Sequence, residues 1–563
     1  MTITSRPRPA RAARPNGQWA VDGQAPLNHN EEMKAADNGL NVRDRIEQIY
    51  SVRGFASIDP DDLNGRMRWW GLYTQRRPGI PGGRTAQLEP HELSDEYFMM
   101  RIRLDGGAVS AHQLRVLGEI STEFARDTAD ISDRQNVQLH WVRIEDVPEI
   151  WRRLEAAGMQ TTEACGDTPR VVLASPVAGV AAEELIDPTP TVAEIVRRFI
   201  GDPELANLPR KFKSAMTGHP SLDVVHETND ISLVAVQHPE LGVGYDLWVG
   251  GGLSTNPRLA ERLGAFVPPQ DAPEVWHAVV RLFRDYGYRR LRNKARLKFL
   301  LAEWGAEKFR QVLEQEYLGY ALHDGPAPPA PVGPSDHVGV HPQKDGRFFV
   351  GAAPTVGRVS GSTLTRLAEI MEAAGSDRLR FTPHQKLLLL DIPEPHVQTV
   401  VEALEPLGLT STPSPFRRST MACTGIEFCK LAIVETKATA AAAITELESR
   451  LADLSDSIPP LSLHVNGCPN SCARIQTADI GLKGQIITVD GEQVPGFQVH
   501  LGGGLASAES AEPELGRTLR GGKVSAAALP DYVEHIVRTW VDQRGPGESF
   551  AAWAHRADEK DLT

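Results

Sequence analysis

"GGAVSAHQLRVLGEIS" (residues 106–121) has a second copy in this chain, "VGRVSGSTLTRLAEIM" (356–371). A second matched pair follows in the same order, "RQNVQLHWVRIED" (134–146) and "HQKLLLLDIPE" (384–394), and the shared Ser and the shared Gln each recur after 250 positions. A repeat of this length is far too long for a solenoid unit. We therefore predict an internal duplication, with two copies of a domain pair related by a pseudo-twofold axis.

The match continues toward the end of each copy. Leu461 follows Leu208 by 253 positions, and Gly502 of "GGGLAS" follows Gly250 of "GGGLST" by 252 positions. Between the copies stands "HDGPAPPAPVGPSDH" (323–337), in which Pro and Gly exclude regular structure and favour an extended linker.

Within each copy the pattern is mixed α/β. Apolar residues from Leu114 to Phe124 recur at helical spacing, "NVQLHWVRI" (136–144) is typical of a strand, and "VPEIWRRLEAAG" (147–158) is typical of a second helix. This order predicts a ferredoxin-like split βαβ module. The predicted fold class is α+β, or mixed α/β, with two ferredoxin-like modules and two larger α/β domains.

These patterns divide the chain into six expected segments. In order, they are a disordered Arg- and Pro-rich arm (1–40), an N-terminal extension with the first ferredoxin-like module (41–160), the first large domain (161–322), the Pro-rich linker (323–339), the second ferredoxin-like module (340–410) and the second large domain (411–563).

Composition narrows the class of protein. The 563 residues carry a formal net charge of -13, which argues against general nucleic-acid binding despite a basic run at 288–298. Five cysteines are too few for a disulfide framework and favour a reducing compartment. No apolar run reaches the roughly 18 to 20 residues of a membrane span, and no signal-peptide core follows the first Met. We expect a cytoplasmic monomer that binds neither membrane nor nucleic acid.

Four of the five cysteines occur in two motifs, "ACTGIEFCK" (422–430) and "HVNGCPNSCA" (464–473). The gaps of five and three residues are wider than the two-residue gaps usual for structural zinc. Four thiolates suit a [4Fe-4S] cluster, although zinc and plain structural thiols remain open at this point. The candidate metal ligands are Cys423, Cys429, Cys468 and Cys472.

The duplication gives these motifs first-copy counterparts that lack cysteine. We expect residues 169–179 to lie opposite 418–430, and residues 208–219 to lie opposite 461–472. The first copy carries three cations in these segments, Arg170, Lys211 and Lys213. This predicts an anion site facing a metal centre.

The two cysteine motifs, taken with "LPRKFK" (208–213), resemble the sirohaem-dependent assimilatory sulfite and nitrite reductases, in particular the actinobacterial type. The resemblance extends over about residues 40–555 and is carried by a highly specific combination of motifs. It implies that the large domains bind sirohaem, that the four cysteines bind a [4Fe-4S] cluster, and that Cys472 also ligates the sirohaem iron. It also implies the six-electron reduction of sulfite to sulfide.

The resemblance implies roles for further residues. Those expected to bind sirohaem are Arg134, Asn136, Gln138, His140, Lys298, Gln385 and Asn470. Those expected to bind and protonate the substrate are Arg101, Arg170, Lys211 and Lys213, with Arg103 as the rival of Arg101. Some members of this type carry a Tyr–Cys thioether beside the sirohaem, which here implies Tyr73 and Cys165.

Substrate and donor follow from the same resemblance. Nitrite reductases tend to carry Asn at the position of Lys213, so sulfite is the primary reading and nitrite the alternative. The chain has no G-x-G-x-x-G in a strand–turn–helix context, which makes a separate reduced ferredoxin the implied electron donor. A precorrin-modifying oxygenase and a non-catalytic iron–sulfur or zinc protein remain as alternatives from other classes.

Overall fold

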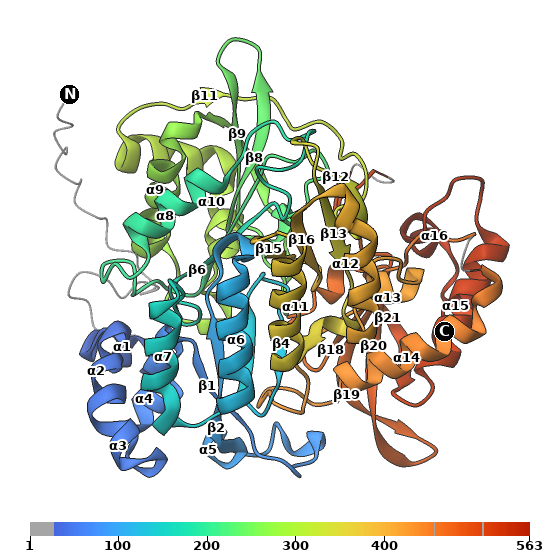
Figure 1. Cartoon of the computed structure of the whole chain (residues 1–563), viewed down its shortest axis with the longest axis horizontal. Coiled ribbons are helices and arrows are strands. Elements are labelled where there is room, and N and C mark those ends of the chain that lie inside the picture. The colour runs from blue at the N-terminus through green and yellow to red at the C-terminus, as the bar shows by residue number, and fades with distance from the viewer. Residues whose placement is uncertain (1–27, 455–456, 509–511) are drawn as a thin grey trace.

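The computed structural model describes residues 28–454, 457–508 and 512–563. Figure 1 shows two central modules whose helices stand side by side, flanked by one larger domain at the top and one at the right. Within the described ranges, no helix combines the length and apolar character needed to cross a membrane.

The two central modules each contain a five-stranded antiparallel sheet. The first has the strand order β1-β2-β5-β4-β14, formed by β1 (Leu72–Arg76), β2 (Ser94–Ile102), β5 (Val137–Val142), β4 (Ala129–Ile131) and β14 (Arg358–Val359). The second has the order β12-β13-β16-β15-β3, formed by β12 (Gly339–Pro342), β13 (Phe348–Ala352), β16 (Leu387–Ile392), β15 (Leu379–Phe381) and β3 (Ala108–Val109).

The modules exchange their edge strands. β14 comes from the second copy and pairs with β4 of the first, while β3 comes from the first copy and pairs with β15 of the second. Each copy thus supplies the strand that closes the edge of the other copy's sheet. This reciprocal pairing confirms the duplication and its pseudo-twofold relation.

The repeated sequence that opens each copy forms one helix. α6 (Ala111–Phe124) and α11 (Gly361–Ala373) each begin after a serine whose side chain accepts a hydrogen bond from the backbone N–H three residues on, at Ser110 and Ser360. α7 (Val147–Ala156) and α12 (Val397–Leu404) follow in the two modules. The helices and strand predicted from 111–158 are confirmed.

The two larger domains share one topology. In each, the first three strands are parallel and the rest antiparallel. The first has β6 (Pro169–Ala174), β7 (Phe212–Thr217), β8 (Ile231–His238), β9 (Gly242–Val249), β10 (Glu261–Val267), β11 (His323–Asp324), α8 (Thr189–Phe199), α9 (Ala272–Tyr286) and α10 (Leu297–Val312). The second has β17 (Met421–Ala422), β18 (Leu463–Asn466), β19 (Ile480–Val489), β20 (Glu492–Leu501), β21 (Arg517–Ser525), α14 (Lys437–Arg450), α15 (Leu529–Gln543) and α16 (Phe550–Arg556).

A pair of glutamines fixes how the two copies correspond. The amide of Gln135 donates to Ala174 O (3.0 Å) and its Oε1 accepts from Ala174 N (3.1 Å). Gln385 makes the same two bonds to Ala422, at 3.0 and 3.3 Å. Because both glutamines clamp the last residue of the first parallel strand, Ala174 corresponds to Ala422.

The next strand corrects the predicted register. Ser214 of β7 pairs with Ile231, and Leu463 of β18 pairs with Ile480 at the same place in the equivalent sheet. "AMTGHPSLD" (215–223) therefore lies opposite "HVNGCPNSC" (464–472), and the expected match of 208–219 with 461–472 is wrong by four residues. The error arose from a shared Leu, whereas the strand ladder sets the true correspondence.

The predicted arm and linker differ in part from the structure. Residues 28–40 are ordered: α1 (His29–Ala36) begins after the capping Asn28, and Lys34 Nζ donates to Leu208 O (2.8 Å) and pairs with Glu31. The prediction of a disordered arm is wrong for this part, and residues 1–27 lie outside the described ranges. The first two linker residues form β11, and residues 325–338 form no helix or strand.

Short helices carry the rest of the N-terminal extension. They are α2 (Val42–Arg45), α3 (Ser51–Arg53), α4 (Pro60–Asn64) and α5 (Pro90–Leu93).

Replacing Gly118 with Val should weaken the contact between α6 and α11. A Cβ on Gly118 would lie 2.3 Å from Thr365 Oγ1 and 2.6 Å from Gly361 O, so the helices would have to separate. We expect a loss of about 1–3 kcal/mol, observed as a lower thermal unfolding midpoint. Gly521→Ala is the control, because a Cβ there meets nothing within 4 Å. An unchanged midpoint for Gly118→Val would contradict the close packing.

Candidate active site

The four clustered cysteines lie on two loops of the second large domain. Cys423 and Cys429 follow β17, and Cys468 and Cys472 follow β18. Burial and the neighbouring Cys472 raise the pKa of Cys423 to about 12, and the same two causes raise the pKa of Cys429 and Cys468. The structure thus brings together the four thiols that the sequence singled out.

The spacing of these thiols favours a cluster over a single ion. In the described part of the chain, no three of the four sulfur atoms lie within 4.8 Å of one another. One tetrahedral zinc would hold its sulfurs about 3.8 Å apart. A backbone donor already points at one ligand, because Gly467 N lies 3.2 Å from Cys423 Sγ. The donor set fits a [4Fe-4S] cluster, with one thiolate for each iron.

A cavity rich in cations adjoins the cysteine loop. It contains about 1030 Å³ of space not filled by protein atoms, part of it open to solvent, and Asn470 and Ser471 of the "CPNSC" loop line it. Its basic lining residues are Arg134, Arg210, Lys211, Lys213, Arg292, Arg296, Lys298 and Arg474. Such a lining suits a ligand with several carboxylates.

Several of these cations are not fully paired. Among the described residues, the Nε of Arg134 and the Nε and Nη1 of Arg474 are buried without a hydrogen-bond partner. Burial lowers the pKa of Arg134 to about 9. Because unpaired buried donors are costly, these atoms fit a site that holds an anionic group such as the sirohaem carboxylates.

Lys211 and Lys213 stand where β7 begins. Burial, followed by the charge of Lys213, lowers the pKa of Lys211 well below its ordinary value. Burial, followed by the charge of Arg134, lowers the pKa of Lys213 to about 7. Cys472 acts in the opposite direction on both lysines. A bound anion would also raise the pKa of both lysines, so this end of the cavity suits an anion.

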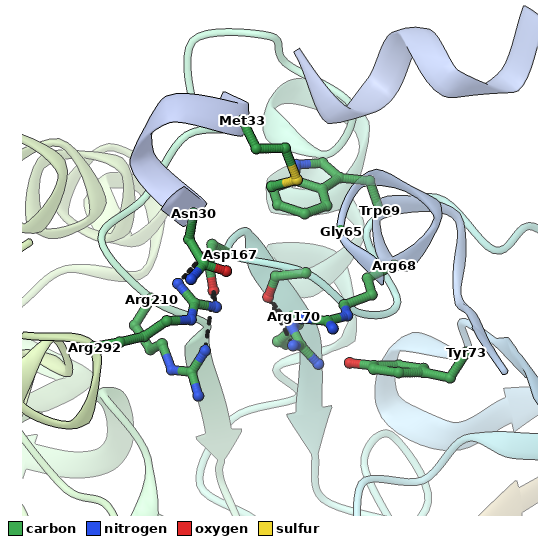
Figure 2. A pocket seen from close by; sticks show the side chains of 11 residues that line it. Asn30, Met33, Gly65, Arg68, Trp69, Tyr73, Asp167, Arg170, Arg210 and Arg292 are labelled. Carbon is green, nitrogen blue, oxygen red and sulfur yellow. Dashed lines mark hydrogen bonds and ion pairs between the residues drawn. The ribbon is translucent and has the colours of Figure 1, made fainter. Parts of the chain in front are cut away.

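Arg170 and Tyr73 line a second, smaller cavity, with about 300 Å³ of space not filled by protein atoms. Figure 2 shows the Tyr73 hydroxyl pointing toward the Arg170 guanidinium, which donates to Gly166 O at 2.7 Å. Arg101 Nη1 lies 2.6 Å from Cys165 Sγ. Burial lowers the pKa of Arg101, but Cys165, Tyr73 and Cys472 together raise it above its ordinary value. The predicted substrate arginines and the Tyr–Cys pair are therefore neighbours.

The structure separates Arg101 from its rival. Arg103 holds Asp105 with two parallel hydrogen bonds of 2.8 and 2.9 Å, and its side chain has no exposed surface. Arg101 instead binds Gln138 Oε1 and reaches Cys165. Arg103 is thus committed to a structural ion pair.

The predicted sirohaem contacts fall into two groups. Arg134, Lys298 and Asn470 line the large cavity, although Lys298 also donates to three backbone carbonyls of the loop after β9. The other four are among neither cavity's lining residues: Asn136, Gln138, His140 and Gln385.

The residues of the second group contact other residues that flank the site. Asn136 accepts from Leu104 N, and Gln138 orients Arg101. The His140 ring stacks on Phe428 with centroids 3.8 Å apart, next to a cluster cysteine. Gln385 clamps Ala422, the residue before Cys423.

Sequence reasoning missed four of the lining cations. Arg292 and Arg296 belong to the basic run at 288–298, where each binds a buried aspartate, Asp167 and Asp230. The sequence marks that run as a basic segment that the cofactor could occupy, but its composition alone does not say which of its arginines line the cavity. The other two missed cations, Arg210 and Arg474, lie within "LPRKFK" and directly after "HVNGCPNSCA", and this proximity was the available signal.

Comparison with known proteins agrees with this geometry. The model of the nitrite and sulphite reductase 4Fe-4S domain matches residues 165–321 and 414–560, and that of the nitrite/sulfite reductase ferredoxin-like half domain matches 91–157 and 341–407. A protein called sulfite reductase [ferredoxin] from Mycobacterium tuberculosis is 58% identical over 99% of both chains. An assimilatory ferredoxin-dependent nitrite reductase from Haloferax mediterranei is 34% identical over 93% of this chain and 90% of its own.

A solved structure gives the same result. The Mycobacterium tuberculosis NirA protein matches with a TM-score of 0.94 and 57% identity, over 98% of this chain and 100% of the other. Both copies of the domain pair therefore have a full-length structural counterpart.

Replacing Cys468 with Ser should remove the cluster, because an alcohol is a much poorer iron ligand than a thiolate. We expect at least about tenfold less acid-labile sulfide per purified chain. Cys165→Ser is the matched control and should leave the sulfide content unchanged, since Cys165 lies outside the group of four. Full sulfide content in Cys468→Ser would contradict the assignment.

Proposed function

Because the chain belongs to the nitrite and sulphite reductase family, we propose that it reduces sulfite to sulfide with six electrons from a reduced ferredoxin. The observation that carries the proposal is Lys213, a second, partly buried lysine in the anion site near Cys472. A doubly charged substrate suits two lysines better than singly charged nitrite does. The similar proteins support this order, since those named sulfite reductases are 58% identical and those named nitrite reductases are 34–35% identical.

The cofactors are a [4Fe-4S] cluster and a sirohaem. We assign the cluster to the four cysteines and the sirohaem to the cavity lined by Arg134 and its basic neighbours. When bound, the two groups would relay the electrons that the ferredoxin donates. Cys472 suits the position between them, because its charge acts on the other three cysteines and also on Lys211 and Lys213.

The chain's own residues bind the anion and supply protons. Arg101 and Arg170 are permanent charges that hold the substrate oxygens, while Lys211 and Lys213 are titratable. A lysine with a pKa of about 7 can donate a proton near neutral pH, which each cleavage of a sulfur–oxygen bond requires. The site thus combines fixed and proton-donating cations around one small anion.

The electron donor belongs to the same proposal. A ferredoxin donor is supported by the names of similar proteins. The cytoplasmic location, the monomeric state and the division into six segments stay predictions.

The test is the specificity of the purified holoenzyme with reduced ferredoxin. We expect kcat/KM for sulfite to exceed that for nitrite by at least about tenfold. The reverse order would favour nitrite reduction. No sulfite-dependent oxidation of the donor at all would favour a precorrin-type oxygenase or a non-catalytic protein.

The Lys213→Asn variant extends this test. Removing one cation from the anion site should lower kcat/KM for sulfite by about 10- to 100-fold and affect nitrite less. The control is Lys560→Asn, at a largely exposed lysine of the C-terminal segment. Equal losses for the two substrates would argue against a role of Lys213 in choosing between them.

We also propose a thioether between the Tyr73 ring and Cys165 Sγ, which removes one hydrogen from each residue and passes the two electrons and two protons to a two-electron oxidant such as dioxygen. Burial and the adjacent Cys165 raise the pKa of Tyr73, and Cys165 has no exposed surface. The intact mass should be about two hydrogens lower than the sequence mass, and Cys165 should resist alkylation after denaturation. Cys165→Ser should show the full sequence mass. A full mass with an alkylated Cys165 in the natural chain would rule out the link.

A further inference from the structure

Three metal-binding side chains meet in the first copy, away from the four thiols. His219 and Asp223 lie in the loop after β7, and His337 ends the linker before β12. One ligand atom from each lies within 4.8 Å of the other two, and the described residues contain no second such group. Asp223 is fully buried, His337 is 5% exposed and His219 is partly exposed.

The carboxylate of this group is held in a fixed orientation. Ser175 Oγ donates to Asp223 Oδ2 at 2.7 Å, and Thr217 Oγ1 donates to Oδ1 at 2.8 Å. His337 Nε2 lies 2.7 Å from Oδ2. Hydroxyl donors behind a carboxylate are the usual outer support of a metal ligand, because they fix its direction and leave lone pairs free.

The two histidines are also constrained. His219 Nδ1 lies 2.8 Å from Ser221 Oγ, which turns Nε2 away from that loop and leaves it as the nitrogen available to a metal. The rings of His219 and His337 meet edge to face, with centroids 4.9 Å apart. His337 has a φ of 55°, in the left-handed region that a non-glycine residue rarely adopts, so its neighbours hold it in place.

The corrected register gives the group its strongest support. The loop after β7 corresponds to the cysteine loop after β18, and both turn through a left-handed residue at the same place, Leu222 (φ 53°) and Ser471 (φ 54°). The resulting equivalences are Ser175 with Cys423, His219 with Cys468, and Asp223 with Cys472. The first copy therefore places metal-ligand residue types, His219 and Asp223, at the positions of Cys468 and Cys472.

We propose that His219, Asp223 and His337 bind one divalent first-row transition metal ion, with zinc as the expected occupant. Two imidazoles and one carboxylate suit zinc and its neighbours in the series, whereas a site without thiolates does not suit an iron–sulfur cluster. Three protein ligands leave a fourth position, on the side where His219 is exposed, for water or another small ligand. Binding would replace the 2.7 Å contact between His337 Nε2 and Asp223 Oδ2, since two ligands of a tetrahedral zinc lie about 3.3 Å apart.

The bound ion would fasten the linker to the first large domain. His337 lies two residues before β12, which is the edge strand of the second module. His219 and Asp223 belong to the first large domain. The ion therefore bridges the two copies at the pseudo-symmetric counterpart of the cluster, and it does so independently of the proposed sulfite reduction.

The test is metal analysis of the full-length holoenzyme. After equilibration with about 10 µM zinc and dialysis, we expect about one zinc per chain, measured beside iron by mass spectrometry. Anomalous diffraction above and below the zinc edge should place one peak between the three side chains, distinct from the iron peaks. Asp223→Asn and His219→Gln should each lower the bound zinc at least tenfold while leaving the acid-labile sulfide unchanged.

His341→Gln is the matched control. This histidine lies four residues after His337 and stacks on Phe349, but it is not part of the group and should keep the zinc. The proposal is overturned if the natural chain with full iron content takes up less than a tenth of an equivalent of zinc. It is also overturned if the anomalous map has no zinc peak there, or if His219→Gln and Asp223→Asn retain the metal. Each of these results would mean that the three side chains only form hydrogen bonds between the linker and the first large domain.

Discussion

The reciprocal exchange of β3 and β14 is the constraint on which the rest of the structure depends. Each strand is only two residues long, yet each pairs with the other copy's sheet and so ties the two modules in one relative orientation. α6 and α11 then pack with Gly118 against Gly361, where any larger residue would force them apart. Because the large domains are attached to these modules, the exchange also brings the cysteine loop of one copy to the cationic strand of the other.

Charge explains why the site is assembled from both copies. The cations that line the large cavity repel one another, and burial lowers the pKa of Arg134, Lys211 and Lys213. Crowding these charges in one partly buried cavity opposes folding. Negative groups relieve that cost, namely the cluster thiolates, a carboxylate-rich cofactor and an anionic substrate. Since such ligands bind the folded state, they stabilise it by mass action.

Pseudo-symmetry gives one scaffold two different chemistries. The loop after each second parallel strand has the same left-handed turn, and the residue types on it decide what it can bind. Thiols on the second copy suit iron and sulfur. Histidine and aspartate on the first copy suit a borderline metal ion such as zinc. The backbone thus supplies the position, and the side chains select the ligand.

The sequence by itself determined the main helices and strands, the duplication and the four candidate cysteine ligands. Apolar spacing from Leu114 to Phe124 predicted α6 correctly, the repeated motifs predicted the duplication, and the spacing of the four cysteines marked them as candidate metal ligands. These signals are local, because helical period, capping serine and clustered thiols are all read within about a dozen residues.

Only the tertiary structure decided which residues meet. Identical leucines suggested one register between the copies, but the glutamine clamps and strand ladders set another, which moved His219 and Asp223 opposite the thiols. It also separated cavity-lining residues such as Arg134 from supporting ones such as His140, and it brought Arg474 into the cavity. The physical reason is that backbone hydrogen bonding and packing across several hundred residues fix these neighbours, and no local pattern encodes that pairing.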